Sequence, residues 1–282
     1  TGTVLTTDGK SFTGTIYTGF ENTYETPWNS VAGKVKQVKF INNIKPTSTS
    51  SWFSGMKNCL SIDMGKLDTS DAEYMSSMFK DCSSLTSLDV SNLTTGRATT
   101  LASMFNGCSS LTALDASNFY TMYLYNISNM FKNCSSLTSL DISNLDTSEV
   151  ANMRGVFSGC SSLTSVTISE GTASIGDSAF NECRNLTSVA IPDSVTSIGE
   201  YVFGDCRSLI SATIPEGVTE IKRGTFYWCT SLTSVSIPDS VTSIGDSAFY
   251  LCTSLASAEI PSSVSSIGTN AFMSCRSLTS VT

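Results

Sequence analysis

The sequence predicts a solenoid, in which short repeated units coil around one axis. The main observation is a phenylalanine that returns at a fixed spacing, first every 26 residues and then every 23 residues. Units this short cannot bury an apolar face alone, whereas stacked copies bury a continuous core. The phenylalanines of the repeat are Phe53, Phe79, Phe105, Phe131 and Phe157, followed by Phe180, Phe203, Phe226, Phe249 and Phe272.

Each unit carries the frame Phe-x-x-Cys-x-x-Leu-x-x-(Leu/Val/Ala)-x-apolar. In the unit that begins at Phe180, the residues Leu186, Val189 and Ile191 reproduce the L-x-x-L-x-L core of a leucine-rich repeat. Val189 and Ile191 are two residues apart, so both point to the same side of a strand. We therefore predict a leucine-rich repeat solenoid with a parallel β-sheet, coiled in the right-handed sense that parallel crossovers favour.

The remainder of each unit predicts a corner, a second extended side and a short helix. In the same unit Pro192 marks the corner, and Val195 and Ile198 begin the second extended side. We expect Gly199 to adopt a positive φ, and Glu200–Cys206 to form one or two helical turns. The 26-residue units have Ser-Asn at the corner and apolar residues at helical spacing before the phenylalanine, which predicts a slightly longer helix.

The first 34 residues do not fit the frame, and we interpret them as an N-terminal β cap. The open end of a solenoid needs a cover, and Asp8-Gly9 is a hairpin signal between two extended runs. Val35, Val38 and Ile41 are expected to supply the first strand of the solenoid sheet.

The frame and its repeat length divide the chain into three segments. They are a β cap over residues 1–34, 26-residue repeats over residues 35–167, and 23-residue repeats over residues 168–282 that continue the same coil. The chain ends at Val281-Thr282 inside a repeat, so we expect it to be a piece of a longer protein.

The composition argues against several classes of function. The formal net charge is −8, which disfavours binding to nucleic acid or to an anionic membrane surface, and no apolar stretch approaches the length of a membrane span. The chain has no histidine, which removes the usual catalytic triads and most catalytic zinc sites. We expect a protein that binds no cofactor and is not an enzyme. Catalysis by paired carboxylates is the alternative that the composition leaves open.

Nine of the ten cysteines, Cys82 to Cys275, occupy one position of successive repeats. Met56 takes that position in the first unit, while Cys59 falls in a leucine position, so packing selects these side chains. Neighbours in the row are about 5 Å apart, which would permit disulfides by geometry. We nevertheless predict buried free thiols, which behave as small apolar side chains, and no bound metal.

Four aspartates occupy one outward position between the inward residues of the strands. Two hypotheses remain open for them, a site for Ca²⁺ or a cationic partner and a solvated face whose carboxylates cap the following turn. These aspartates are Asp63, Asp89, Asp115 and Asp141.

Two groups of aromatic residues replace the polar or small residues of neighbouring repeats. Grouped exposed apolar residues are typical of recognition surfaces, so both groups are candidate partner-binding sites. The alternatives are drift of the repeat and a surface covered by sequence beyond this chain. The first group is Tyr120, Tyr123 and Tyr125, and the second is Tyr227, Trp228 and Tyr250 together with Leu251 and Met273.

The stretch IPDSVTSIGDSAFYLCTSLASAEIP, residues 237–261, resembles the BspA-like branch of bacterial leucine-rich repeat proteins, and residues 168–282 follow its 23-residue unit. Residues 53–167, which include MFKDCSSLTSLDVSNL, resemble a related 26-residue unit of surface proteins from mycoplasmas and Gram-positive gut bacteria. The resemblance implies a bacterial cell-surface or extracellular protein that binds a host or neighbouring-cell protein or glycan, without enzymatic activity. It supplies no fixed binding residues.

Three hypotheses for function therefore stand side by side. The first is an adhesion module, the second is a structural spacer of a larger surface protein that binds nothing itself, and the third is an enzyme that uses carboxylates. We expect a monomer with no membrane insertion within this chain.

Overall fold

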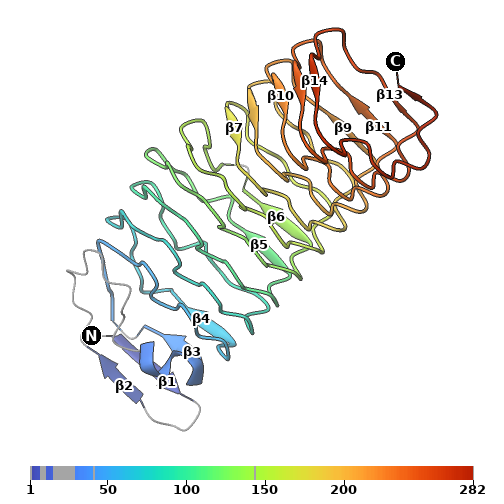
Figure 1. Cartoon of the computed structure of the whole chain (residues 1–282). Coiled ribbons are helices and arrows are strands. Elements are labelled where there is room, and N and C mark those ends of the chain that lie inside the picture. The colour runs from blue at the N-terminus through green and yellow to red at the C-terminus, as the bar shows by residue number, and fades with distance from the viewer. Residues whose placement is uncertain (1, 7–10, 15–28, 41, 143, 282) are drawn as a thin grey trace. The chain divides into compact units, whose positions relative to one another are not determined.

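The computed structural model describes residues 2–6, 11–14, 29–40, 42–142 and 144–281. Its contacts group the chain into two units, Thr1–Glu149 and Val150–Thr282. Each unit is built of stacked coils with parallel strands (Figure 1), which confirms the predicted leucine-rich repeat solenoid. The predicted boundary between residues 167 and 168 marks the change from 26-residue to 23-residue repeats, which is a different criterion from contacts, and it remains a prediction.

The first unit opens with an antiparallel hairpin made of β1 (Gly2–Thr6) and β2 (Ser11–Gly14). On its other edge β1 pairs antiparallel with β3 (Val35–Lys39), which in turn pairs parallel with β4 (Ser61–Asp63). The strand order β2-β1-β3-β4 therefore joins the hairpin to the first parallel pair of the solenoid.

The first strand of the solenoid sheet lies where the sequence predicts it. Val35 and Val38 are buried in β3, as predicted. The short 3₁₀ helix η1 (Asn29–Lys34), which the sequence pattern did not indicate, leads into that strand. The predicted turn at Asp8-Gly9 and the side chain of Ile41 lie outside the described residues.

The strands of later coils are short and pair with the same position of the neighbouring coil. In the first unit β5 (Ala113–Asp115) pairs parallel with β6 (Ser139–Asp141). In the second unit, two series of strands run along two sides of the coils (Figure 1), as the repeat predicts. One series is β9 (Ser211–Thr213), β11 (Ser234–Ser236), β13 (Ser257–Ala258) and β15 (Ser280–Val281). The other is β7 (Ser174–Ile175), β8 (Ser197–Ile198), β10 (Glu220–Ile221), β12 (Ser243–Ile244) and β14 (Ser266–Ile267).

The repeated phenylalanines form a stacked column inside each unit. From Phe53 to Phe131, successive rings of the column are 5.4 Å apart, and from Phe157 to Phe272 the spacing is 5.0–5.5 Å. Stacked aromatic pairs contribute about 0.5–1.5 kcal/mol beyond the burial of their surface. The predicted register of the repeat is therefore confirmed within both units.

The segment around each phenylalanine is not helical, so the predicted short helices are wrong. The described residues contain one helix, η1, and the segments in question are successive turns. The residues two before and two after each phenylalanine have positive φ, as in Ser77 (58°) and Asp81 (59°). The amides of Ser77, Phe79 and Asp81 donate to carbonyls of the next coil, while the amide of Lys80 donates to Ser77 within its own coil. Alternate amides are thus used between coils, which leaves no continuous i→i−4 series for a helix.

Gly199 serves close packing, whereas a positive φ was expected. A Cβ atom at Gly199 would lie 2.5 Å from the backbone nitrogen of Asp177 in the preceding coil, and Gly176, Gly245 and Gly268 meet their neighbours in the same way. Glycine is required here because two backbones approach each other too closely for any side chain.

The cysteine row is buried from Cys82 to Cys252, as predicted, and its thiols donate hydrogen bonds to backbone carbonyls of the preceding coil. The Sγ of Cys82 donates to the carbonyl of Phe53 at 3.1 Å, and the Sγ of Cys206 donates to Phe180 at 3.1 Å. Cys59, in the leucine position, donates instead to Ser61. Burial raises the pKa of the Cys206 thiol well above its ordinary value, and the neighbouring cysteine reinforces the shift.

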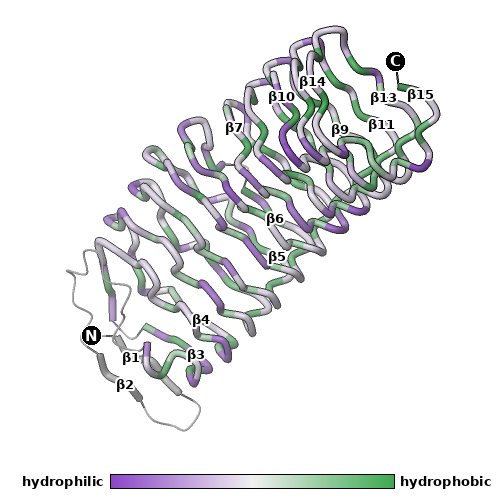
Figure 2. Tube along the Cα trace, viewed as in Figure 1, coloured by the Kyte–Doolittle hydropathy of each residue, from purple (hydrophilic) through white to green (hydrophobic). Residues whose placement is uncertain are grey.

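Hydrophobic and hydrophilic segments alternate along each coil (Figure 2). This alternation buries one set of side chains inside each unit and leaves a surface rich in serine and threonine. In the described part of the chain, no helix combines the length and apolar character needed to cross a membrane.

Candidate functional site

The predicted row of aspartates lies on the surface of the first unit. Asp63, Asp89, Asp115 and Asp141 are all exposed, and Asp115 and Asp141 are register partners in β5 and β6. The carboxylate of Asp63 lies 3.7 Å from the ammonium group of Lys39, so this end of the row is paired with a cation of the chain itself.

Asp63, Asp89 and Asp115 each cap the turn that follows them. Asp89 accepts the backbone amide of Ser91 at 2.9 Å, and Asp115 accepts both the amide (3.0 Å) and the hydroxyl (2.6 Å) of Ser117. These hydrogen bonds, first from the serine side chains and then from their amides, lower the pKa of Asp89 and of Asp115. Within the described residues, no three acidic or cysteine side chains are grouped so as to hold a metal ion. The geometry favours the turn-capping hypothesis over a Ca²⁺ site.

The first tyrosine group lies on an exposed loop of the first unit. Tyr120 is 60% exposed, Tyr123 61% and Tyr125 52%, and Met122 between them is 61% exposed. Leu124 is buried, as the repeat predicts. One loop therefore presents four large side chains to solvent, although the three tyrosines do not all face one site.

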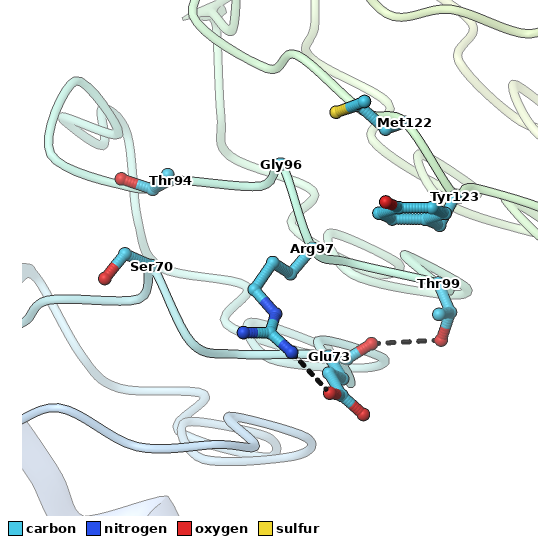
Figure 3. Close-up of a pocket in the computed structure, with 8 residues that line it drawn as sticks. All are labelled: Ser70, Glu73, Thr94, Gly96, Arg97, Thr99, Met122 and Tyr123. Atoms are coloured by element: carbon cyan, nitrogen blue, oxygen red, sulfur yellow. Dashed lines mark hydrogen bonds and ion pairs between the residues drawn. The ribbon is translucent and has the colours of Figure 1, made fainter.

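Tyr123 and Met122 form one wall of a hollow that spans three successive coils (Figure 3). Ser70 and Glu73 come from the first of these coils, and the segment 94–99 of the next coil supplies Thr94, Gly96, Arg97 and Thr99. The guanidinium of Arg97 donates to the carboxylate of Glu73 at 3.2 Å. A cation and an anion are thus held together beside an exposed aromatic ring.

The second aromatic group lies beside the phenylalanine column of the second unit, and it is larger than predicted. The rings of Tyr227 and Tyr250 are stacked at 5.1 Å, and Trp228 packs edge-on against Tyr227 at 6.1 Å. Tyr201 of the preceding coil joins them, with its ring centroid 6.0 Å from that of Tyr227. We call these four residues the aromatic cluster. Trp228 is 40% exposed.

Two arginines flank the aromatic cluster. The guanidinium of Arg207 lies 4.9 Å from the ring centroid of Trp228, and that of Arg223 lies 5.9 Å from the ring of Tyr201. Asp205, whose side chain is only 11% exposed, accepts hydrogen bonds from Arg207. Because this carboxylate fixes the guanidinium, the cation is held over the indole face before any partner arrives.

A glycine makes room for part of the cluster. A Cβ atom at Gly224 would lie 2.3 Å from Cε1 of Tyr201, so the tyrosine ring occupies the space that a side chain would fill. Gly224 also has a positive φ of 62°. This position therefore suits glycine for two independent reasons.

Sequence reasoning missed several residues that the structure brings to these surfaces. Tyr201 stands two residues before its phenylalanine, where other coils have serine, asparagine or glycine, and that departure was a usable signal. Glu73 and Arg207 gave no such signal, because their importance depends on partners in a neighbouring coil. Of the two other residues predicted for the second aromatic group, Leu251 is half-buried and Met273 is 50% exposed.

The sequence matches one protein family along most of its length. Residues 32–137, 77–210 and 150–279 match the BspA type leucine rich repeat region, in six copies. The match extends over the 26-residue units as well as the 23-residue units. A search of curated proteins finds no match.

Solved structures that are similar to this chain include several bacterial proteins. A leucine-rich repeat protein from T. pallidum is 29% identical, with a TM-score of 0.52, and the alignment covers 59% of this chain and 76% of that one. A leucine-rich repeat protein from Bacteroides ovatus is 20% identical (TM-score 0.48, covering 88% and 82%). A leucine rich cell surface protein from Faecalibacterium prausnitzii is 21% identical (TM-score 0.43, covering 88% and 83%). The repeat frame, the stacked coils and the family match lead to one conclusion: this chain belongs to the BspA-type leucine-rich repeat family.

Proposed function

We propose that the chain is an adhesion module on the surface of a bacterium, and that the aromatic cluster of the second unit docks a protein of a host or of a neighbouring cell. Proteins with leucine-rich repeats generally mediate interactions with other proteins, which supports the general class. The observation that carries the proposal is the preorganised group of Tyr227, Trp228 and Tyr250 with Arg207 fixed above the indole.

The composition and rigidity of the cluster support protein docking. Tyrosine, tryptophan and arginine are the residues most enriched among those that dominate the binding energy of protein interfaces. Their side chains are already ordered by stacking and by the Asp205–Arg207 hydrogen bonds, so little side-chain entropy remains to be lost on binding. A cluster that only filled space would not need to hold Trp228 partly in water.

The experiment measures binding of the chain to a panel of purified host extracellular-matrix proteins by surface plasmon resonance. We expect Trp228→Ser and Tyr227→Ser each to weaken binding at least tenfold, because removal of a central aromatic anchor costs about 2 kcal/mol or more. The melting temperature should change little for Trp228→Ser. Ser188→Ala, at an exposed position away from the cluster, is the matched control and should bind as the parent does.

The alternative function is a structural spacer that binds nothing itself. No binding to any protein of the panel, or equal binding by the parent and both variants, would favour the spacer and contradict docking at the cluster. Surface location has its own test, namely antibody labelling of intact cells of the bacterium that encodes the chain. Light scattering tests the further proposal that the module acts as a monomer.

We also propose that the 26-residue units are a variant repeat related to the surface proteins of mycoplasmas and Gram-positive gut bacteria. The Ser-Asn corner supports a distinct variant of the repeat, because it stands where the 23-residue units have proline and makes contacts of its own. The side-chain amide of Asn118 donates to the carbonyls of Val90 (3.0 Å) and Leu93 (2.9 Å) in the preceding coil. Proteins built only of 26-residue units with this asparagine would support a separate lineage.

A further inference from the structure

The hollow beside Tyr123 lies in the first unit, apart from the aromatic cluster, and the proposal made for it does not depend on protein docking. Three successive coils contribute to it: Ser70 and Glu73, then Thr94 to Thr99, then Met122 and Tyr123 (Figure 3). Regular stacking would fill such a space with similar side chains from each coil. Here the equivalent position instead carries a small side chain, none and a large one in the three successive coils.

The floor of the hollow is open because of one glycine. Ser70, Gly96 and Met122 occupy the same position in three consecutive 26-residue units. A Cβ atom at Gly96 would meet only the carbonyl oxygen of Tyr120, at 3.9 Å, so a side chain could stand there without strain. The glycine is therefore not required by the backbone, and its effect is to leave room between Ser70 and Met122.

The walls of the hollow differ in chemistry. On one side, Tyr123 and Met122 present exposed apolar surface. On the other side, the guanidinium of Arg97 and the carboxylate of Glu73 are paired at 3.2 Å, and the hydroxyl of Thr99 donates to the Glu73 carbonyl at 3.0 Å. The Glu73–Thr99 contact joins neighbouring coils through the backbone of Glu73, while the carboxylate of Glu73 is held by Arg97.

The pairing of charges restricts the ligand. Arg97 and Glu73 compensate each other, so the hollow has no net charge to attract phosphate, sulfate or a metal ion. The pair still offers N–H donors and carboxylate acceptors to a group that can do both, as a hydroxyl can. The electron-rich face of Tyr123 suits the weakly positive C–H groups of a ring with little polarity on one side.

We propose that this hollow is a binding site for a neutral saccharide. A sugar ring has an apolar C–H face for Tyr123 and a rim of hydroxyls for Arg97, Glu73 and the threonines. The open form of the hollow suits a residue within or at the end of a longer glycan, since much of the ligand remains in water. Affinity for a short oligosaccharide is therefore on the order of 1 mM.

Saturation-transfer difference NMR on the full chain tests the site, with lactose, maltotriose and di-N-acetylchitobiose as neutral probes and sialyllactose and a sulfated heparin disaccharide as charged probes. We expect at least one neutral probe to receive saturation, and neither charged probe to bind more tightly than it. Gly96→Leu, which fills the floor, and Tyr123→Ser, which removes the wall, should each weaken binding at least tenfold. Tyr125→Ser changes an exposed tyrosine of the same loop outside the lining of the hollow, and it should bind within twofold of the parent.

Circular dichroism spectra and melting curves ensure that each variant is folded, and the two variants alter opposite sides of the hollow, so one remains informative if the other is unstable. The proposal is overturned if none of the neutral probes binds, if binding is retained in both Gly96→Leu and Tyr123→Ser, or if only the charged saccharides bind. Equal loss in Tyr125→Ser would also contradict it, because the effect would then belong to the loop as a whole.

Discussion

A buried cysteine in this fold contributes as an apolar side chain and as a hydrogen-bond donor. Cys206 has no exposed surface, and its thiol donates to the carbonyl of Phe180 in the preceding coil. The half-buried Cys275 makes the equivalent bond to Phe249. Repetition of one contact in successive coils explains why the position accepts so little chemical variety.

The thiol row predicts that stability falls in alkaline solution. The folded pKa of Cys206 is raised above the unfolded value of about 8.5, so the folded state retains a proton that the unfolded state loses. The stabilisation is complete below that pH and is lost as pH rises through the folded pKa. Above pH 9 each such thiol should lower the free energy of unfolding by about 1.4 kcal/mol per pH unit.

Urea denaturation between pH 7 and 10.5 measures this effect. Cys206→Ala should cost about 1 kcal/mol at pH 7, from lost burial and a lost hydrogen bond, and its stability should fall less steeply with pH than that of the parent. Cys275→Ala, at the half-buried position, should change the slope less. Identical slopes for the parent and Cys206→Ala would show that burial of this thiol does not control the alkaline transition.

At the scale of the element, backbones of adjacent coils are held together by alternate amides and by glycines at close approaches. The turn segment around Phe79 illustrates the first device, and Gly199 above Asp177 illustrates the second. Neither device can be read from local propensity, because each depends on a partner one coil away. For that reason the sequence pattern predicted helices where the structure has turns.

Gly199→Ala should be among the most damaging small substitutions in the chain. The new methyl would lie 2.5 Å from a backbone nitrogen, and overpacking against backbone costs about 3 kcal/mol. Gly96→Ala is the matched control, because its Cβ has open space, and it should change stability by less than about 0.5 kcal/mol. Equal melting temperatures for the two variants would contradict the close approach at Gly199.

The Ser-Asn corner gives a second prediction at this scale. Asn118→Ala removes donors to the carbonyls of Val90 and Leu93, and we expect a loss of about 1–2 kcal/mol in the free energy of unfolding. Asn92 occupies the same position one coil earlier, is exposed, and makes no such bonds among the described side chains. Asn92→Ala is the control. If it lowers the free energy of unfolding as much as Asn118→Ala does, the proposed role of the corner is contradicted.

At the scale of the molecule, the fixed period made much of the fold predictable. The phenylalanine column, the buried cysteines and the two strand series all follow from positions that recur along the chain. The fold therefore emerges from sequence spacing wherever the same position pairs with itself in the next coil, as Ile244 does with Ile221 and Ile267.

The candidate surfaces were predictable only in part, because they join different positions of different coils. Tyr227 and Trp228 stood out as replacements for polar residues, but Tyr201 reaches them from two residues before its own phenylalanine, across Gly224. The Glu73–Arg97 pair likewise joins positions that do not match in the repeat. Such diagonal contacts depend on the pitch and turn geometry of the coil, which the spacing of residues does not specify.

The position of a residue in the repeat should decide whether it supports the fold or is available to a partner. Phe226 and Trp228 test this directly, because they are two residues apart, one fully buried in the phenylalanine column and the other partly exposed. The decisive measurement is the free energy of unfolding of Phe226→Ala and Trp228→Ala by urea denaturation. We expect a loss of about 3–5 kcal/mol for Phe226→Ala and less than about 1 kcal/mol for Trp228→Ala. Equal losses, or a larger loss for Trp228→Ala, would contradict the assignment of interior and surface by repeat position.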